Sequence, residues 1–174
     1  ETQGIDLVLL NEWMNDQSLP PGEIGVVDRL LGGTQNILLR FERGGRHYVF
    51  RRPPIHKRAH SDETMRREAR VLGALKGSNV PHPELIAACG DESLLGAAFY
   101  LMEPIDGFNA TTGLPELHEG DRDIRHGMGL AMADGISALG AVDYSVVGLD
   151  GFGRPEGFLE RQVSRWQHQL ETYG

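Results

Sequence analysis

The alternation of apolar and polar residues changes its period along the chain, and this divides the first hundred residues into helices and strands. Apolar residues recur at helical spacing up to about Asp16, and Asp6 is placed to cap that helix. From Gly25 the period becomes two, which predicts three strands in "GVVDRLL", "NILLRFE" and "RHYVFR". The intervening "ERGGR" predicts a tight hairpin between the second and third strands.

A second helix and two further strands are expected next. The apolar spacing predicts a helix that is capped by Ser61 or Asp62, runs to about Leu75 and is closed by Gly77. A proline-bounded strand is expected in "VPHPELIAACGDE", with "GDE" as a turn. Another is expected in "GAAFYLMEP", where Pro104 stops it.

Beyond these strands the sequence favours helices. "DGFNATTGLPELHEGD" has the composition of a loop, and helices are predicted over about residues 122–139 and 158–172. This order predicts an α+β fold. We expect residues 1–104 to form a lobe with an antiparallel sheet and a covering helix, and residues 105–174 to form a hinge and the start of an α-helical lobe.

Composition and charge narrow the classes of partner. The chain has 174 residues and a formal net charge of −8, which disfavours nucleic acids and anionic membrane surfaces as partners. Cys89 is the single cysteine, so no internal disulfide can form, and neither a secretory signal nor a long apolar span is present. We therefore expect a cytoplasmic protein.

The segment "LGGTQNILLRF" is the first candidate for chemistry. Gly32 and Gly33 would let the backbone approach a phosphate closely, and Thr34, Gln35 and Asn36 could add hydrogen-bond donors. On spacing alone, an ordinary turn between two strands explains the same residues.

The strand "RHYVFR" carries a candidate cation. Strand alternation places Arg51 on the same face as Val49, where a cation beside an adenine pocket would be expected. Arg52 is an alternative to Arg51, and both residues could instead be solvated charges at the end of a strand.

Glu68 is the third candidate. It falls on the apolar stripe of the second helix with Met65 and Ala69, and a carboxylate on such a stripe needs a cationic partner. Arg51 is one candidate for this partner. An exposed arginine of the same helix is the other, and the helix alone does not decide between them.

Four features follow each other in the order found in a protein-kinase nucleotide lobe: a glycine turn, a strand cation, a helix glutamate and an apolar strand before a hinge. The segments "GGTQNILLRF", "YVFRRPP", "MRREARVLGAL", "VPHPELIAAC", "FYLMEPIDGF" and "GFLERQVSRW" resemble successive blocks of the aminoglycoside phosphotransferase-like family, over nearly the whole chain. Within this kinase-fold family, the sequence is similar to a bacterial branch related to the amino-terminal kinase-like domain of acyl-CoA dehydrogenase fusion proteins.

The resemblance implies a kinase-like amino-terminal lobe, followed by an incomplete helical lobe, that binds ATP and magnesium. Residues 32–36 would cover the ATP phosphates, Arg51 would replace the usual strand lysine, and Glu68 would orient that cation. The remaining implied binding residues line the adenine side: Val49, Met102 as the gatekeeper-like residue, and Glu103 and Ile105 as donors or acceptors from the backbone. By residue type alone, Met102 is first of all a core residue.

The family's catalytic loop and magnesium-binding segment have no counterpart in this sequence. "HEGDRD" near Asp121 is only superficially similar to the catalytic loop and lies at the wrong point in the order. Among the histidines, only His56 and His60 lie four residues apart, so no metal site is expected. We expect the catalytic and metal-binding residues in a part of the protein outside this chain.

Three hypotheses follow from the sequence. The first is the amino-terminal part of an ATP-dependent phosphotransferase, whose partners are a small-molecule hydroxyl acceptor and its own carboxy-terminal lobe. The second is a kinase-like module that binds a nucleotide or a partner without catalysis. The third is a structural α+β domain that forms a homodimer.

Overall fold

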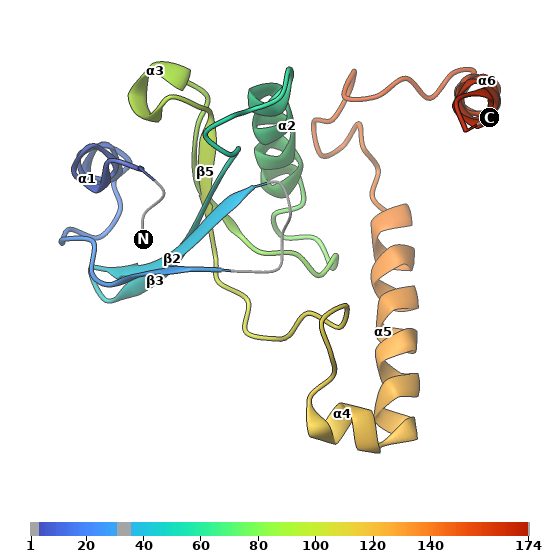
Figure 1. Ribbon diagram of the computed structural model, residues 1–174, viewed down its shortest axis with the longest axis horizontal. Helices are drawn as coiled ribbons and strands as arrows, with labels where there is room; N and C mark the ends of the chain where they lie inside the picture. The colour runs from blue at the N-terminus through green and yellow to red at the C-terminus, as the bar shows by residue number, and fades with distance from the viewer. Residues whose placement is uncertain (1–3, 31–35, 174) are drawn as a thin grey trace. The chain divides into compact units, whose positions relative to one another are not determined.

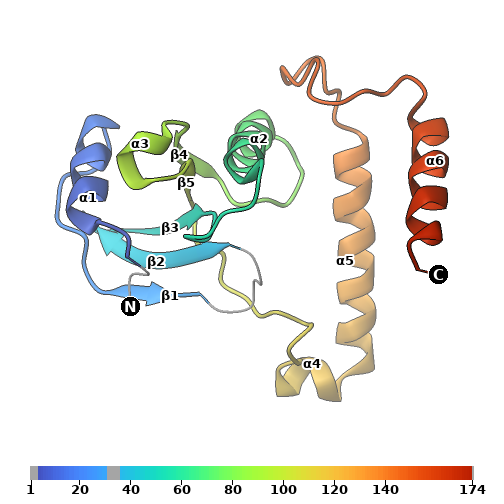
Figure 2. The same ribbon diagram turned by 45° about the horizontal axis from the view of Figure 1, so that its top comes forward.

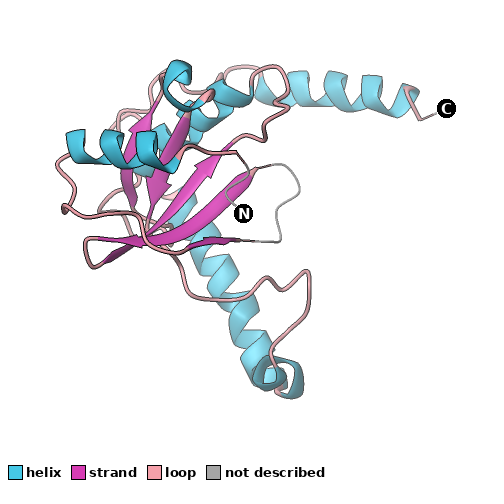
Figure 3. Cartoon of the chain, turned by 60° about the vertical axis from the view of Figure 1, so that its left-hand side comes forward, coloured by secondary structure: helices cyan, strands magenta, loops and turns pink. Residues whose placement is uncertain are grey.

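The computed structural model describes residues 4–30 and 36–173. The chain forms two compact units, residues 1–142 and residues 143–174. All the strands of the described chain precede residue 103, and helices follow (Figure 3). The predicted order of helix, three strands, helix, two strands and further helices is confirmed. The boundary expected between residues 104 and 105 stays a prediction.

A five-stranded antiparallel sheet forms the centre of the first unit (Figure 1). Its spatial order is β1-β2-β3-β5-β4, and every neighbouring pair is antiparallel. The strands are β1 (Val27–Arg29), β2 (Ile37–Arg43), β3 (Arg46–Arg52), β4 (Leu85–Cys89) and β5 (Phe99–Met102). The mixed helix and antiparallel-sheet content confirms the predicted α+β class.

One face of the sheet carries the larger core cluster. Leu39 and Phe50 are directly opposite each other on β2 and β3, and both are fully buried. Helix α1 (Leu7–Asp16) lies beside the sheet (Figure 2). It adds Leu10 and Met14 to this cluster. As predicted, Asp6 caps α1, since its carboxylate accepts hydrogen bonds from the amides of the first turn at 2.9 and 3.1 Å.

Helix α2 (Ser61–Ala74) packs on the other face of the sheet, at β4 and β5. Because alternate residues of a strand point to opposite faces, Phe99 and Leu101 join the cluster under α1, whereas Tyr100 lies in the cluster under α2. The α2 cluster also contains Met65 and Ala69. The predicted apolar stripe of this helix is therefore its buried face.

The predicted cap of α2 is wrong. His60 occupies the cap position in a left-handed conformation, with φ of 66°, and makes no side-chain capping bond. Ser61 and Asp62 lie inside the first turn of the helix. The carboxylate of Asp62 is engaged elsewhere, where it accepts a hydrogen bond from the amide of Ala98 at 2.8 Å.

Two short helices occupy segments that the sequence predicts as turn and loop. Asp91 caps the one-turn helix α3 (Glu92–Leu95) through a 2.8 Å bond to the amide of Ser93. Helix α4 (Glu116–Gly120) lies in the expected loop after Pro104. Both are too short to show a hydrophobic period.

The longer helices of the second half occur where they are predicted. They are α5 (Arg122–Gly140) and α6 (Phe158–Glu171), and neither contains a buried residue. No described helix combines the length and apolar character that crossing a membrane requires.

Candidate functional site

Val49 and Arg51, two of the residues that sequence analysis singles out, lie on the face of the sheet opposite α1. Leu38 is paired with Arg51 across these two strands, and Arg40 with Val49. Val49 is buried, whereas about a quarter of the Arg51 side chain is exposed. Strand alternation therefore places an apolar surface next to a cation, with Leu38 and Arg40 as neighbours that sequence reasoning did not name.

Arg51 and Glu68 form a side-on ion pair between β3 and α2. Arg51 Nε lies 3.1 Å from Glu68 Oε2, and Arg51 Nη2 donates a hydrogen bond to Glu68 Oε1 at 3.2 Å. Of the two partners that the sequence leaves open for Glu68, the structure therefore shows the arginine of the strand. With 27% and 32% of the two side chains exposed, the pair contributes at most about 1 kcal/mol to stability. Its main effect is to fix the position of the guanidinium.

Tyr100 is a member of this group that sequence reasoning missed. Its hydroxyl donates a hydrogen bond to Glu68 Oε2 at 3.0 Å, and it is the cross-strand neighbour of Arg51. Burial raises the pKa of Tyr100, the charge of Arg51 partly offsets this, and the carboxylate of Glu68 raises the pKa further, so the hydroxyl stays protonated at neutral pH. Alternation along "FYLM" could have placed Tyr100 on this face, but not its hydroxyl beside Glu68.

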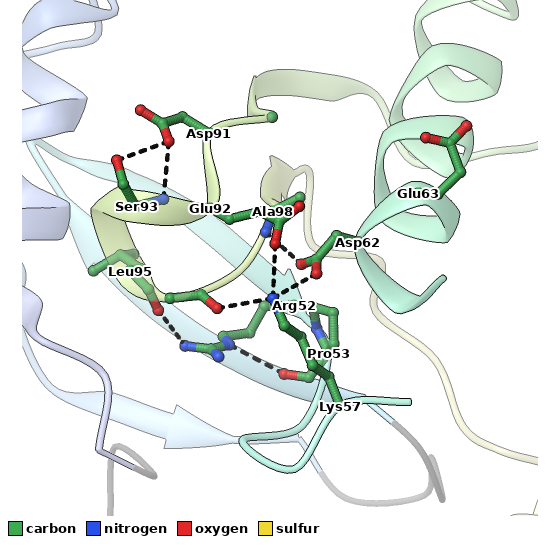
Figure 4. A network of polar contacts seen from close by, with 12 residues as sticks. Arg52, Pro53, Lys57, Asp62, Glu63, Asp91, Glu92, Ser93, Leu95 and Ala98 are labelled. Atoms are coloured by element: carbon green, nitrogen blue, oxygen red, sulfur yellow. Dashed lines mark hydrogen bonds and ion pairs between the residues drawn. The ribbon is translucent and has the colours of Figure 1, made fainter. Parts of the chain in front are cut away.

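Arg52 lies on the opposite face of the sheet and takes part in a different network (Figure 4). Its Nε donates to the carbonyl of Pro53 at 3.0 Å, and its Nη1 donates to the carbonyl of Leu95 at 2.8 Å. Burial lowers the pKa of Arg52, and Asp62 partly offsets this effect. Of the two arginines that the sequence leaves open, Arg51 is therefore the one beside Glu68.

A network of charged side chains fixes the start of α2 (Figure 4). Lys57 Nζ lies 2.5 Å from Asp62 Oδ2 and 3.0 Å from Glu92 Oε2, and it also donates to the carbonyl of Gly96. One turn further along α2, Arg66 contacts Glu92 at 2.7 Å. The helix that carries Glu68 is thus attached at two successive turns to the segment between β4 and β5.

The end of β5 contains the remaining predicted residues. Met102 is partly buried against the α2 cluster, and Ile105 is 66% exposed. The amide of Glu103 donates to the carbonyl of Glu84 at 2.9 Å. Of the backbone groups of Glu103, the carbonyl oxygen is therefore the one that could contact adenine. The binding roles of these residues stay predictions.

The glycine segment is only partly described. Gly32, Gly33, Thr34 and Gln35 lie outside the described residues, and Asn36 directly precedes β2. Their role as a phosphate loop stays a prediction. In the described ranges, no group of three His, Cys, Asp or Glu side chains is arranged to hold a metal ion.

Comparison with known proteins identifies the family. The sequence model of the phosphotransferase enzyme family matches residues 27–173. The chain belongs to this family. The expected resemblance to aminoglycoside phosphotransferase-like proteins is thereby confirmed.

A crystal structure supports the same assignment. It is that of a Ralstonia eutropha protein described as a "putative aminoglycoside phosphotransferase", which is 30% identical to this chain with a TM-score of 0.77. The match covers 97% of this chain and 48% of that chain. This similarity confirms the kinase-like fold.

The curated relatives are much longer proteins. Acyl-CoA dehydrogenase family member 11 of Gallus gallus is 31% identical over 88% of this chain and 19% of its own length. Acyl-CoA dehydrogenase family member 10 of Mus musculus is 31% identical over 73% of this chain and 12% of its own length. The chain therefore spans about a fifth or less of the length of these relatives.

Proposed function

We propose that this chain is the nucleotide-binding part of an ATP-dependent phosphotransferase that acts on a hydroxyl group of a small molecule. The observation that carries the proposal is the Arg51–Glu68 ion pair on the sheet face that also holds Val49. Membership of the phosphotransferase enzyme family supports it. The groups that catalyse transfer and bind the metal are expected in a further part of the protein, as the family resemblance implies.

The chemistry of the residues fits a nucleotide. A guanidinium neutralises phosphate and donates in a planar fork, so Arg51 would bind a phosphate group while Glu68 fixes its direction. Leu38, which is only partly buried, offers apolar surface to a base, and Val49 lies on the same face of the sheet. Magnesium, when bound with ATP, would neutralise charge that develops on the transferred phosphate.

Arginine in place of lysine at this position changes how the cation is held. A lysine ammonium is a point charge that pairs with one oxygen at a time, whereas Arg51 contacts both carboxylate oxygens of Glu68 through two nitrogens. The pair is therefore restricted in rotation as well as in distance. We expect Arg51→Lys to retain the charge and lose this orientation.

ATP and adenosine titrations test the proposal. In calorimetric titrations, we expect the protein to bind ATP more tightly than adenosine, and Arg51→Gln to weaken ATP binding by about tenfold while adenosine binding is unchanged. Arg46→Gln is a matched control, because Arg46 starts the same strand and 43% of its side chain is exposed. Failure of the unmodified protein to bind ATP, or full ATP affinity in Arg51→Gln, would contradict the proposal.

A further inference from the structure

Tyr100 connects the sheet and the helix at the centre of the candidate site. Tyr100 is 97% buried and packs in the cluster with Met65 and Ala69, which flank Glu68 on α2. Its backbone lies directly opposite Arg51 in the β3–β5 ladder. One side chain therefore contacts the helix that carries the carboxylate and neighbours the strand that carries the cation.

The hydrogen bond from Tyr100 restricts the carboxylate in a way that the ion pair alone does not. Glu68 Oε2 accepts the hydroxyl at 3.0 Å and lies 3.1 Å from Arg51 Nε, while Oε1 accepts Nη2 at 3.2 Å. A glutamate has three rotatable side-chain bonds, and about a third of the Glu68 side chain is exposed. A donor fixed in the core therefore selects one orientation of this carboxylate.

We propose that Tyr100 is a positioning residue for phosphate binding, because its hydroxyl holds the Glu68 carboxylate in the orientation that fixes the Arg51 guanidinium. This inference rests on the proposed function, since it assigns Tyr100 to the same ATP site. Tyr100 acts through Glu68 and Arg51 and makes no contact with the nucleotide itself. The group of three residues, rather than the ion pair, is then the unit that prepares the site.

Tyr100→Phe tests the inference, because it removes the hydroxyl and leaves the ring that fills the core. We expect ATP affinity to fall by about three- to tenfold, whereas adenosine affinity stays unchanged because adenosine carries no phosphate. The readout is the ratio of the two affinities, measured by calorimetry with the phosphate-free and phosphate-bearing ligands under the same conditions.

Tyr48→Phe is the matched control. Tyr48 is a fully buried tyrosine on β3, and its side chain lies on the face of the sheet opposite that of Arg51, where its ring stacks on Phe41. Its hydroxyl has no hydrogen-bond partner among the described residues. Removing this hydroxyl should leave both affinities unchanged. The two variants therefore differ in whether the lost hydroxyl contacts Glu68.

The outcomes separate the inference from the proposed function. An unchanged ATP-to-adenosine ratio in Tyr100→Phe would overturn the positioning role while ATP binding by the unmodified protein still supports the proposed function. An equal loss of both affinities would also overturn it, because that result indicates a purely structural role. If the unmodified protein binds no ATP, the proposed function fails and the inference fails with it.

Discussion

Arg51 and Arg52 are adjacent in sequence and lie in different environments. Alternation along β3 predicts that they face opposite sides of the sheet, but it does not say which side faces a ligand. Tertiary contacts distinguish the two arginines: Arg51 forms an ion pair with Glu68 of α2, and Arg52 donates a hydrogen bond to the carbonyl of Leu95. Such contacts join segments at least 17 residues apart, which explains why the sequence left both arginines as candidates.

Replacing Arg52 separates its structural role from binding. We expect Arg52→Met to lower the free energy of unfolding by about 1–3 kcal/mol, because the carbonyl of Pro53, which is buried, and that of Leu95, which is partly buried, lose their donor. ATP affinity should not change. Urea denaturation and ATP calorimetry measure the two effects. A loss of ATP affinity without a loss of stability would show that Arg52, rather than Arg51, serves the nucleotide.

At the scale of elements, periodic patterns were predicted well, and features that depend on distant partners were not. The apolar stripe of α2 correctly predicts which face of this helix is buried and that Glu68 lies on that face. The predicted cap of this helix is wrong, because the carboxylate of Asp62 accepts a hydrogen bond from the amide of Ala98, which lies 36 residues away in the sequence. Helix α3 was missed because a single turn has no period, although Asp91 carries a capping signal.

The network at the start of α2 predicts a pH dependence of stability. Burial alone would raise the pKa of Asp62, but hydrogen bonds from Lys57 and the Ala98 amide lower it below its ordinary value. A carboxylate with a lowered pKa stabilises the fold fully above the pKa of an unfolded aspartate, which is about 3.9, and this contribution is lost as the pH falls through the folded value. Stability should therefore decline on acidification below about pH 5.

Asp62→Asn isolates this contribution. We expect the variant to be less stable at neutral pH and to lose less stability than the unmodified protein between about pH 5 and pH 2. Asp16→Asn is the control, because Asp16 is an exposed carboxylate at the end of α1. Urea unfolding at a series of pH values gives the slope of the unfolding free energy against pH for each protein. Equal slopes for Asp62→Asn and the unmodified protein would mean that Asp62 does not stabilise α2 through its charge.

At the scale of the whole molecule, burial is uneven along the chain. The core residues of the described chain lie between residues 5 and 101, and helices α4, α5 and α6 contain no buried residue. Helix α6 and the residues after it expose apolar side chains that recur every three or four positions: Leu159, Val163, Trp166, Leu170 and Tyr173. This spacing predicts a helix face that is suited to packing against another apolar surface.

Amide hydrogen exchange tests whether that face is covered in solution. Peptides from β3 and β5 should exchange slowly because their amides open only when the sheet unfolds, whereas peptides from α6 should exchange faster by orders of magnitude. The measurement is exchange followed by mass spectrometry on residues 46–52, 99–102 and 158–171. If α6 is protected as strongly as β3, its apolar face is covered, and Trp166→Glu should then abolish the protection of α6 while leaving that of β3 unchanged. The expected fast exchange of α6, together with slow exchange of β3 and β5, would show that the sheet is stable while the apolar face of α6 is uncovered.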